Sequence, residues 1–272
     1  MPRVCCACLL ALCCLAAQAR PPTLQDEQLV ETGWLTSNRA LLMVPDRPRA
    51  LALLFPGGGG DLGLSGGRGM VNFGSQLYMN FLVAARGLFF ERDLAVLIID
   101  APGGRAMSAQ QRLGALGQLP GLLAQARKLA PLLQDLPVWA LGTSAGTISV
   151  AGLIEQAPDY LAGVVLSSSI TQGAGEGGQW NSANPQGIAS MRLDRFERPV
   201  LVLAHRDDQC RYTPPADAAL LDARFVRSVR HRALVLETPS RTFGDPCGPN
   251  SPHGFAELES EAVESMVRFM LD

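Results

Sequence analysis

Short runs of apolar residues recur along the chain and separate stretches with a different pattern. Six runs are apolar at nearly every position, which is typical of strands covered on both faces of a sheet. The predicted strands span residues 50–55, 95–100, 138–143, 163–168, 200–204 and 233–236. A seventh run, 41–44, is predicted to be an antiparallel strand at the edge of the sheet.

Apolar residues at helical spacing occupy the stretches between these runs. The predicted helices cover 73–90, 109–133, 146–156, 216–226 and 255–271, and the second is interrupted at Pro120, where the proline ring removes a backbone donor. Strands that alternate with helices predict an α/β fold with a mostly parallel central sheet and helices on both faces. In such folds ligands bind at the carboxyl ends of the strands.

Residues 172–198 break this alternation. They are rich in Gly, Asn and Ser, have little periodicity, and lie between two predicted strands. A segment of this kind is either a long surface loop or a lid that contacts the substrate, and the sequence does not separate the two interpretations.

The first residues have a pattern of their own. Arg3 precedes an apolar stretch over 4–17, and Ala17-Gln18-Ala19 matches a cleavage site with small residues on either side. We therefore predict a signal peptide over 1–19, which is too short for a stable membrane span, and a single α/β domain over 20–272. The mature protein is then exported to the periplasm or the extracellular space, with no integral membrane segment left after cleavage.

Cleavage changes the cysteine content of the protein. Five of the seven cysteines lie within 1–19, so the mature chain keeps Cys210 and Cys247. Two cysteines in an exported protein predict one disulfide, and without a cluster of further ligands they do not predict a metal site. The net charge of −2 and the interspersed charges, with no basic run, argue against nucleic acid as a partner.

Two stretches match the pattern G-x-S-x-G, which decides nothing alone because 28 of the 272 residues are glycine. GTSAG, residues 142–146, lies between a predicted strand and a predicted helix, the context of a nucleophile elbow. Ser144 is then exposed at the end of the strand, and the N–H of Ala145 can bind an oxyanion. GLSGG, residues 63–67 around Ser65, has no strand directly before it and no helix after it, so we interpret it as a flexible loop.

A serine hydroxyl needs a base to act as a nucleophile, and the chain has three histidines. His205 directly follows a predicted strand, and we interpret it as structural. His231 enters a strand at its amino end, far from the carboxyl ends, and is interpreted as solvated. His253 lies in the loop between the last strand and the last helix, at the same edge of the sheet as Ser144, and is the predicted base.

An acid is needed to orient this imidazole, and the stretch HRDDQC after the penultimate predicted strand offers two. Asp207 and Asp208 both qualify. We favour Asp208, which lies closer to Cys210, and keep Asp207 as the alternative acid. A Cys210–Cys247 bridge would tie the loop of the acid to the loop of His253.

A glycine-rich loop, FPGGGGDLGL, follows the first long strand. The chain lacks the G-x-x-x-x-G-K-[ST] pattern of a phosphate-binding loop, and the loop lacks the strand-to-helix turn of a dinucleotide site. We therefore predict that the loop supplies a second oxyanion donor, the N–H of Gly58 or Gly57, and that no cofactor is used.

Together these residues resemble the α/β-hydrolase superfamily. The resemblance rests on FPGG after an early strand, GTSAG at the elbow, HRDDQC after the penultimate strand and PHGF before the final helix, in the Ser–Asp–His order of that fold. It covers the chain from about residue 41 onward. It implies that Ser144 is the nucleophile, His253 the base and Asp208 the acid, with the amides of Gly58 and Ala145 as the oxyanion hole.

The resemblance implies an exported serine hydrolase that cleaves a carboxylic ester of a small-molecule or acyl substrate through an acyl-enzyme. A peptidase or a thioesterase on the same triad is the alternative among enzymes, because the fold hosts many chemistries. A non-catalytic secreted binding protein on the same scaffold is the alternative outside enzymes. The chain departs from many relatives at Pro56-Gly57, where they have His-Gly, and in the short spacing between His205 and the acid. The second departure keeps Asp207 as an alternative.

Overall fold

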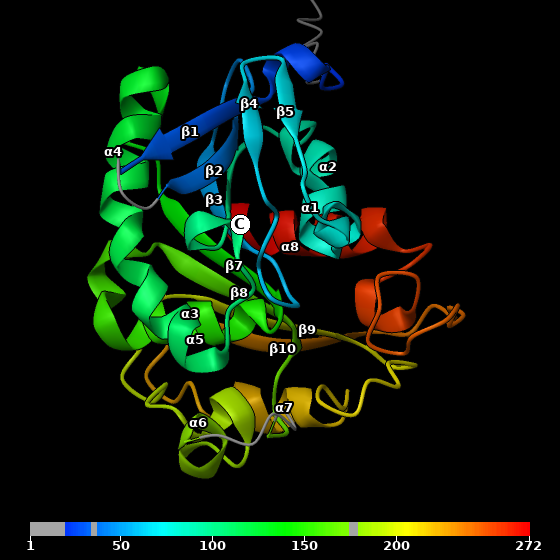
Figure 1. The fold of residues 1–272 in the computed structure, drawn as a ribbon. Coiled ribbons are helices and arrows are strands. Elements are labelled where there is room, and N and C mark those ends of the chain that lie inside the picture. Colours follow the sequence, from blue (N-terminus) through cyan, green and yellow to red (C-terminus); the bar gives the residue numbers. More distant parts are fainter. Residues whose placement is uncertain (1–19, 34–36, 174–178) are drawn as a thin grey trace, which may run out of the picture.

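A twisted central sheet with helices on both faces organises the protein (Figure 1). The structure is a computed structural model that describes residues 20–33, 37–173 and 179–272. The predicted signal peptide over 1–19 lies outside these residues. Among the residues described, no helix is both long and apolar enough to cross a membrane.

The central sheet has eight strands in the order β1-β2-β6-β3-β7-β8-β9-β10. The first two are antiparallel to their neighbours, and the six from β6 to β10 are parallel. The predicted fold class is confirmed, and all six apolar runs form parallel strands. The strands are β1 (Gln28–Thr32), β2 (Asn38–Met43), β3 (Ala50–Phe55), β6 (Leu94–Ile99), β7 (Val138–Ser144), β8 (Gly163–Ser169), β9 (Val200–His205) and β10 (His231–Leu236).

Two predictions near the start of the chain are wrong. β2 is antiparallel but does not lie at the edge, because β1 pairs with it on the outer side. β1 reads QLVET and buries only Val30, so it lacks the apolar run that marks the other strands. GLSGG is not a plain loop either: β4 (Ser65–Gly67) pairs with β5 (Met70–Asn72) in a small hairpin.

The helices flank the sheet. Apart from a short helix in the segment 172–198, they lie within the stretches where helices are predicted, but most are shorter than predicted. They are α1 (Phe81–Ala84), α2 (Arg86–Phe90), α3 (Ala109–Ala115), α4 (Leu119–Leu129), α5 (Gly146–Gln156), α6 (Gln179–Ala183), α7 (Asp217–Asp222) and α8 (Glu259–Leu271). Among them α5 has the predicted bounds. α8 begins later than predicted because Phe255 adopts a left-handed φ of 54°, which ends the preceding turn.

Two long predicted helices are divided in the structure. The stretch 73–90 forms a 3-10 turn and two short helices, because Asn80 has an extended ψ of 138° and Ala85 a ψ of 3°. The stretch 109–133 is divided by a 3-10 turn over Leu116–Gln118, not at Pro120. Pro120 lies in the first turn of α4, where its missing N–H removes no helical hydrogen bond.

The core forms two layers because successive residues of a strand point to opposite faces. Leu53 of β3 belongs to the layer under α4, α5 and α7, whereas Leu54 belongs to the layer under α1, α2 and α8. Both side chains are fully buried. Full burial of a leucine contributes about 1.5–3 kcal/mol, so a strand that is apolar on both faces stabilises both layers.

The described part of the segment 172–198 packs against the α5 layer rather than standing free. Trp180, Ile188, Leu193 and Phe196 are buried in that cluster. Residues 174–178, near the start of the predicted lid or loop, lie outside the described residues. A lid role for this segment therefore stays a prediction.

Candidate active site

Ser144 stands at the sharp bend between β7 and α5. Its φ is +53°, a left-handed conformation that a residue with a side chain adopts only where the surrounding structure enforces it. Glycine is required on both sides of Ser144 because other backbone atoms lie too close for a side chain. A Cβ on Gly142 would lie 2.7 Å from the Gly146 carbonyl oxygen, and one on Gly146 would lie 1.9 Å from that of Phe55. The bend is thus possible only with glycine at both positions.

Thr147 fixes the bend from inside the protein. Its hydroxyl donates to the carbonyl oxygen of Ser144 at 2.6 Å and accepts the N–H of Ile170 at 3.3 Å. The Ser144 side chain itself makes no hydrogen bond to any residue that the structure describes, and Ser144 is half-buried. Ala145 lies at the N-terminus of α5, whose 11 residues direct their positive dipole end at the bend.

His253 and Asp208 form a buried pair in the loops beyond β10 and β9. Nδ1 of His253 lies 3.1 Å from Oδ2 of Asp208, and the two side chains are 5% and 1% exposed. The Thr213 hydroxyl donates to the same oxygen at 2.9 Å, and the N–H of Cys210 donates to Oδ1 at 2.8 Å. A carboxylate that accepts from Nδ1–H leaves Nε2 of the neutral imidazole as the nitrogen that can take a proton.

Asp207, the alternative acid, has a different environment. Its side chain is 37% exposed and lies 3.4 Å from the Nε of Arg206. Among the residues described, the carboxylate that pairs with His253 is that of Asp208. The structure therefore brings Asp208, and not Asp207, to the imidazole.

The two other histidines lie where the sequence predicts. His205 ends β9, donates from Nε2 to the carbonyl oxygen of Thr238 at 2.9 Å, and accepts the N–H of Asp207 at Nδ1. These bonds hold the loop that follows β9, as expected of a structural residue. His231 begins β10 and lies 3.0 Å from Asp222.

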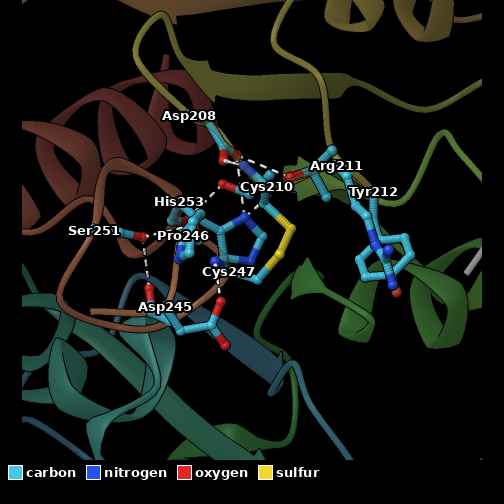
Figure 2. The surroundings of a disulfide bond; sticks show 12 residues. Asp208, Cys210, Arg211, Tyr212, Asp245, Pro246, Cys247, Ser251 and His253 are labelled. Carbon is cyan, nitrogen blue, oxygen red and sulfur yellow. Dashed lines mark hydrogen bonds and ion pairs between the residues drawn. A yellow bond between two sulfur atoms is a disulfide. The ribbon is translucent and has the colours of Figure 1, made fainter. Parts of the chain in front are cut away.

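Two connections hold the His253 loop beside the elbow. Ser169 of β8 pairs with Ser144 across a register shift, and the adjacent Ser168 donates its hydroxyl to the carbonyl oxygen of His253 at 2.8 Å. The predicted disulfide is present between Cys210 and Cys247, directly beside the Asp208–His253 pair (Figure 2). The loops of Asp208 and His253 are therefore joined both to each other and to the strand next to Ser144.

The glycine-rich loop after β3 packs directly on the bend at Ser144. A Cβ on Gly57 would lie 2.9 Å from the Cβ of Ser144, so only glycine allows this approach. Gly58 follows with a φ of +54° and is exposed. Within the described chain, the N–H groups of Gly58 and Gly59 donate to no protein acceptor, which leaves them able to bind a substrate oxygen.

Sequence reasoning missed three residues that shape the site. Thr213 contacts both members of the Asp208–His253 pair, Ser168 binds the backbone of His253, and Arg112 contacts the glycine-rich loop. Ser168 and Arg112 contact residues far away in the sequence, and Thr213 lies in an irregular loop, so no local sequence pattern marks any of the three. The burial of Arg112 is evident only from the structure, so the sequence carries no signal for it.

No protein-family model matches the sequence, and no curated protein matches it either. Solved structures do match. An esterase from Pyrococcus furiosus aligns with a TM-score of 0.63 at 10% identity, over 92% of this chain and 97% of the esterase. Est1E from Butyrivibrio proteoclasticus aligns with a TM-score of 0.57 at 15% identity, over 90% of this chain and all (100%) of Est1E.

A peptidase is also similar. The acylaminoacyl peptidase from Pyrococcus horikoshii aligns with a TM-score of 0.58 at 12% identity, over 94% of this chain but 42% of the peptidase. Identities this low establish the fold and not the activity. Together with the strand order and the bend at Ser144, they show that this chain has the α/β-hydrolase fold.

Proposed function

We propose that the protein is an exported serine hydrolase that cleaves a carboxylic ester with Ser144, His253 and Asp208. The observation that carries the proposal is the buried Asp208–His253 pair, which leaves Nε2 available on a loop bonded to the strand beside Ser144. The strained φ of Ser144 supports it, because such strain is concentrated at active sites.

The proposed reaction proceeds in two steps. The Ser144 oxygen attacks the substrate carbonyl while its proton moves to Nε2 of His253, and Asp208 stabilises the imidazolium that forms. The imidazolium then protonates the leaving alcohol as its C–O bond breaks, which gives an acyl-enzyme. Water attacks the acyl group, its proton moves to Nε2, and this proton returns to Ser144 as the acid leaves. The N–H groups of Gly58 and Ala145 bind the oxyanion in each step.

The choice of an ester rests on the structural neighbours, one of which is named as an esterase. Est1E was solved with ferulic acid bound. Peptide hydrolysis is the second candidate, because an acylaminoacyl peptidase is also similar. A panel of matched ester, thioester and peptide substrates with the same acyl group separates these activities.

A fluorophosphonate probe tests the nucleophile directly. We expect mass spectrometry to find the adduct on Ser144 of the oxidised protein and none in Ser144→Ala, while Ser65→Ala, in the second G-x-S-x-G stretch, is labelled normally. An adduct on Ser65 would contradict the assignment. A folded protein that is neither labelled nor active on the panel would favour the non-catalytic binding protein.

Export is the remaining part of the proposal. The Cys210–Cys247 disulfide supports it, since such bonds persist in oxidising compartments. Determination of the N-terminus of the protein recovered from its producing cells tests it: we expect a chain that begins at Arg20, and a chain that keeps residues 1–19 would contradict the predicted signal peptide.

A further inference from the structure

Arg112 is a buried cation that binds the glycine-rich loop from behind. Its Nη1 donates to the carbonyl oxygen of Pro56 at 3.2 Å, and its Nη2 donates to those of Gly57 and Gly58 at 3.2 and 2.6 Å. Arg112 is 2% exposed. Within the described chain no carboxylate lies at ion-pair distance from it, so three peptide carbonyls are its partners.

The helix that carries Arg112 begins against the loop. Ser108 caps α3 in a capping box with Gln111, which sets the direction of the first turn. Met107, one residue earlier, donates its N–H to the carbonyl oxygen of Gly59 at 2.9 Å. Helix start and loop are therefore joined by main-chain and side-chain bonds, and Arg112 enters the space behind the loop from the next turn.

The three carbonyls matter because a trans peptide unit is planar and rigid, with its C=O and N–H pointing in opposite directions. The carbonyl of Gly57 belongs to the same unit as the N–H of Gly58, and the carbonyl of Gly58 to the same unit as the N–H of Gly59. A group that binds these carbonyls from behind turns the two N–H groups outward. Both have no acceptor in the described chain, and the loop packs on Ser144 through Gly57.

The loop has one internal hydrogen bond among the described residues, from the N–H of Gly60 to the carbonyl oxygen of Gly57 at 3.0 Å, and little stiffness otherwise. Gly58 and Gly60 have φ values of +54° and +73°, and four glycines in succession give the backbone wide freedom. Its orientation therefore depends on external bonds, of which Arg112 makes three. Burial lowers the pKa of Arg112 to about 10, against the opposing effect of the Asp61 carboxylate, so the guanidinium is charged at neutral pH.

We propose that Arg112 is a positioning residue for the oxyanion hole: it holds the peptide units of Gly57 and Gly58 so that the N–H groups of Gly58 and Gly59, beside that of Ala145, face the carbonyl attacked by Ser144. Its positive charge also polarises these units in the direction that favours a developing negative charge. The inference rests on the proposed function. It adds a residue outside the triad, Arg112, whose effect is mainly to stabilise the transition state.

Arg112→Met tests the proposal because methionine fills much of the space without a donor or a charge. We expect kcat to fall by about 100-fold, the size of effect seen when an oxyanion donor is lost, while KM changes little. Affinity for a boronic acid inhibitor, whose adduct on Ser144 carries a negative oxygen in the hole, should fall in parallel. Arg112→Lys should restore part of kcat, because an ammonium keeps the charge but cannot match three carbonyls.

A matched control is Arg230→Met. Arg230 is half-buried and also donates to a backbone carbonyl, that of Phe269 at 2.6 Å, but it precedes β10 at the opposite end of the strands from Ser144. Loss of this bond should reduce the thermal midpoint and leave kcat and boronic acid affinity unchanged. Comparison of the two variants separates a general loss of stability from a specific loss of oxyanion binding.

Clear outcomes would overturn the proposal. A folded Arg112→Met protein with wild-type kcat, or with a loss confined to KM, contradicts it, as does unchanged boronic acid affinity. If Arg112→Met does not fold, Arg112→Lys decides: wild-type kcat and affinity there contradict the need for the guanidinium. Ser144-dependent hydrolysis with no effect at Arg112 overturns this inference alone, whereas no Ser144-dependent hydrolysis in the wild-type protein overturns both proposals.

Discussion

The protein contains one five-residue pattern twice, and the two copies have different surroundings. In GTSAG, Ser144 ends a buried strand with a left-handed φ, and the last glycine faces the backbone of β3. In GLSGG, Ser65 begins a three-residue strand and is exposed. Its first glycine, Gly63, has a φ of +62° and lies against Gly74, but a Cβ on its last glycine, Gly67, would meet nothing within 4 Å. The pattern is informative only where it lies at a strand-to-helix bend that requires glycine at both of its ends.

The largest expected difference between the two copies is in catalysis. Ser144→Ala should lower kcat/KM for an ester by roughly 10⁴-fold or more, because the attacking oxygen is lost. Ser65→Ala should leave it unchanged, since the hairpin lies outside the proposed triad. Steady-state rates on a chromogenic ester measure both, and equal effects of the two substitutions would remove the distinction.

The glycines give the next largest difference. Gly146→Ala should cost about 4 kcal/mol or more in the free energy of unfolding, because its Cβ would lie 1.9 Å from the Phe55 carbonyl oxygen and force β3 and α5 apart. This strain outweighs the gain of about 1 kcal/mol that alanine brings to a helix. Gly67→Ala should change the free energy by less than about 0.5 kcal/mol. Urea denaturation compares the two, and a mild Gly146→Ala would contradict the close packing.

The disulfide extends the comparison, because the loops that it joins are bonded through Ser168 to the strand beside the GTSAG bend. Cys210 and Cys247 are 37 residues apart, so replacing both by serine should reduce the free energy of unfolding by about 3–4 kcal/mol. Ester hydrolysis should fall as well, since the Asp208 and His253 loops lose their link. Denaturation and rates with and without reductant measure both effects. A reduced protein with full activity would show that the bridge serves stability alone.

A smaller effect is expected at Thr213. Thr213→Val removes a donor to the buried Asp208 carboxylate at nearly constant volume, and should cost about 1.5–3 kcal/mol of stability together with part of kcat. Asp207→Asn, in the same loop but exposed, is the control and should alter neither quantity. Thermal denaturation and steady-state kinetics test the pair. A larger loss at Asp207 than at Thr213 would reopen the choice of acid.

The sequence predicts the parallel part of the fold well for a physical reason. Strands covered on both faces are apolar throughout, so β3, β6, β7, β8, β9 and β10 are visible as runs. Their carboxyl ends lie together, which is why the neighbourhood of Ser144, Asp208 and His253 follows from chain order. β1 is missed because it buries one residue, and the β4–β5 hairpin because its strands are short and exposed.

The residues that the sequence does not predict act through long-range hydrogen bonds. Arg112 meets Gly58 across 54 residues, and Ser168 meets His253 across 85. Such contacts depend on the folded arrangement and leave no periodicity or motif. The choice between Asp207 and Asp208 has the same cause. The two residues are adjacent in the chain, so the sequence places both near His253, and only the direction of each side chain in the structure separates them.

The left-handed φ of Ser144 has a consequence for how the protein tolerates change. Glycine adopts this conformation without penalty, whereas a residue with a Cβ is strained by about 1–2 kcal/mol. Ser144→Gly should therefore give a protein that is inert but harder to melt than the wild type. Stability favours glycine at this position, whereas the proposed reaction requires serine, so the serine is explained by a requirement other than stability.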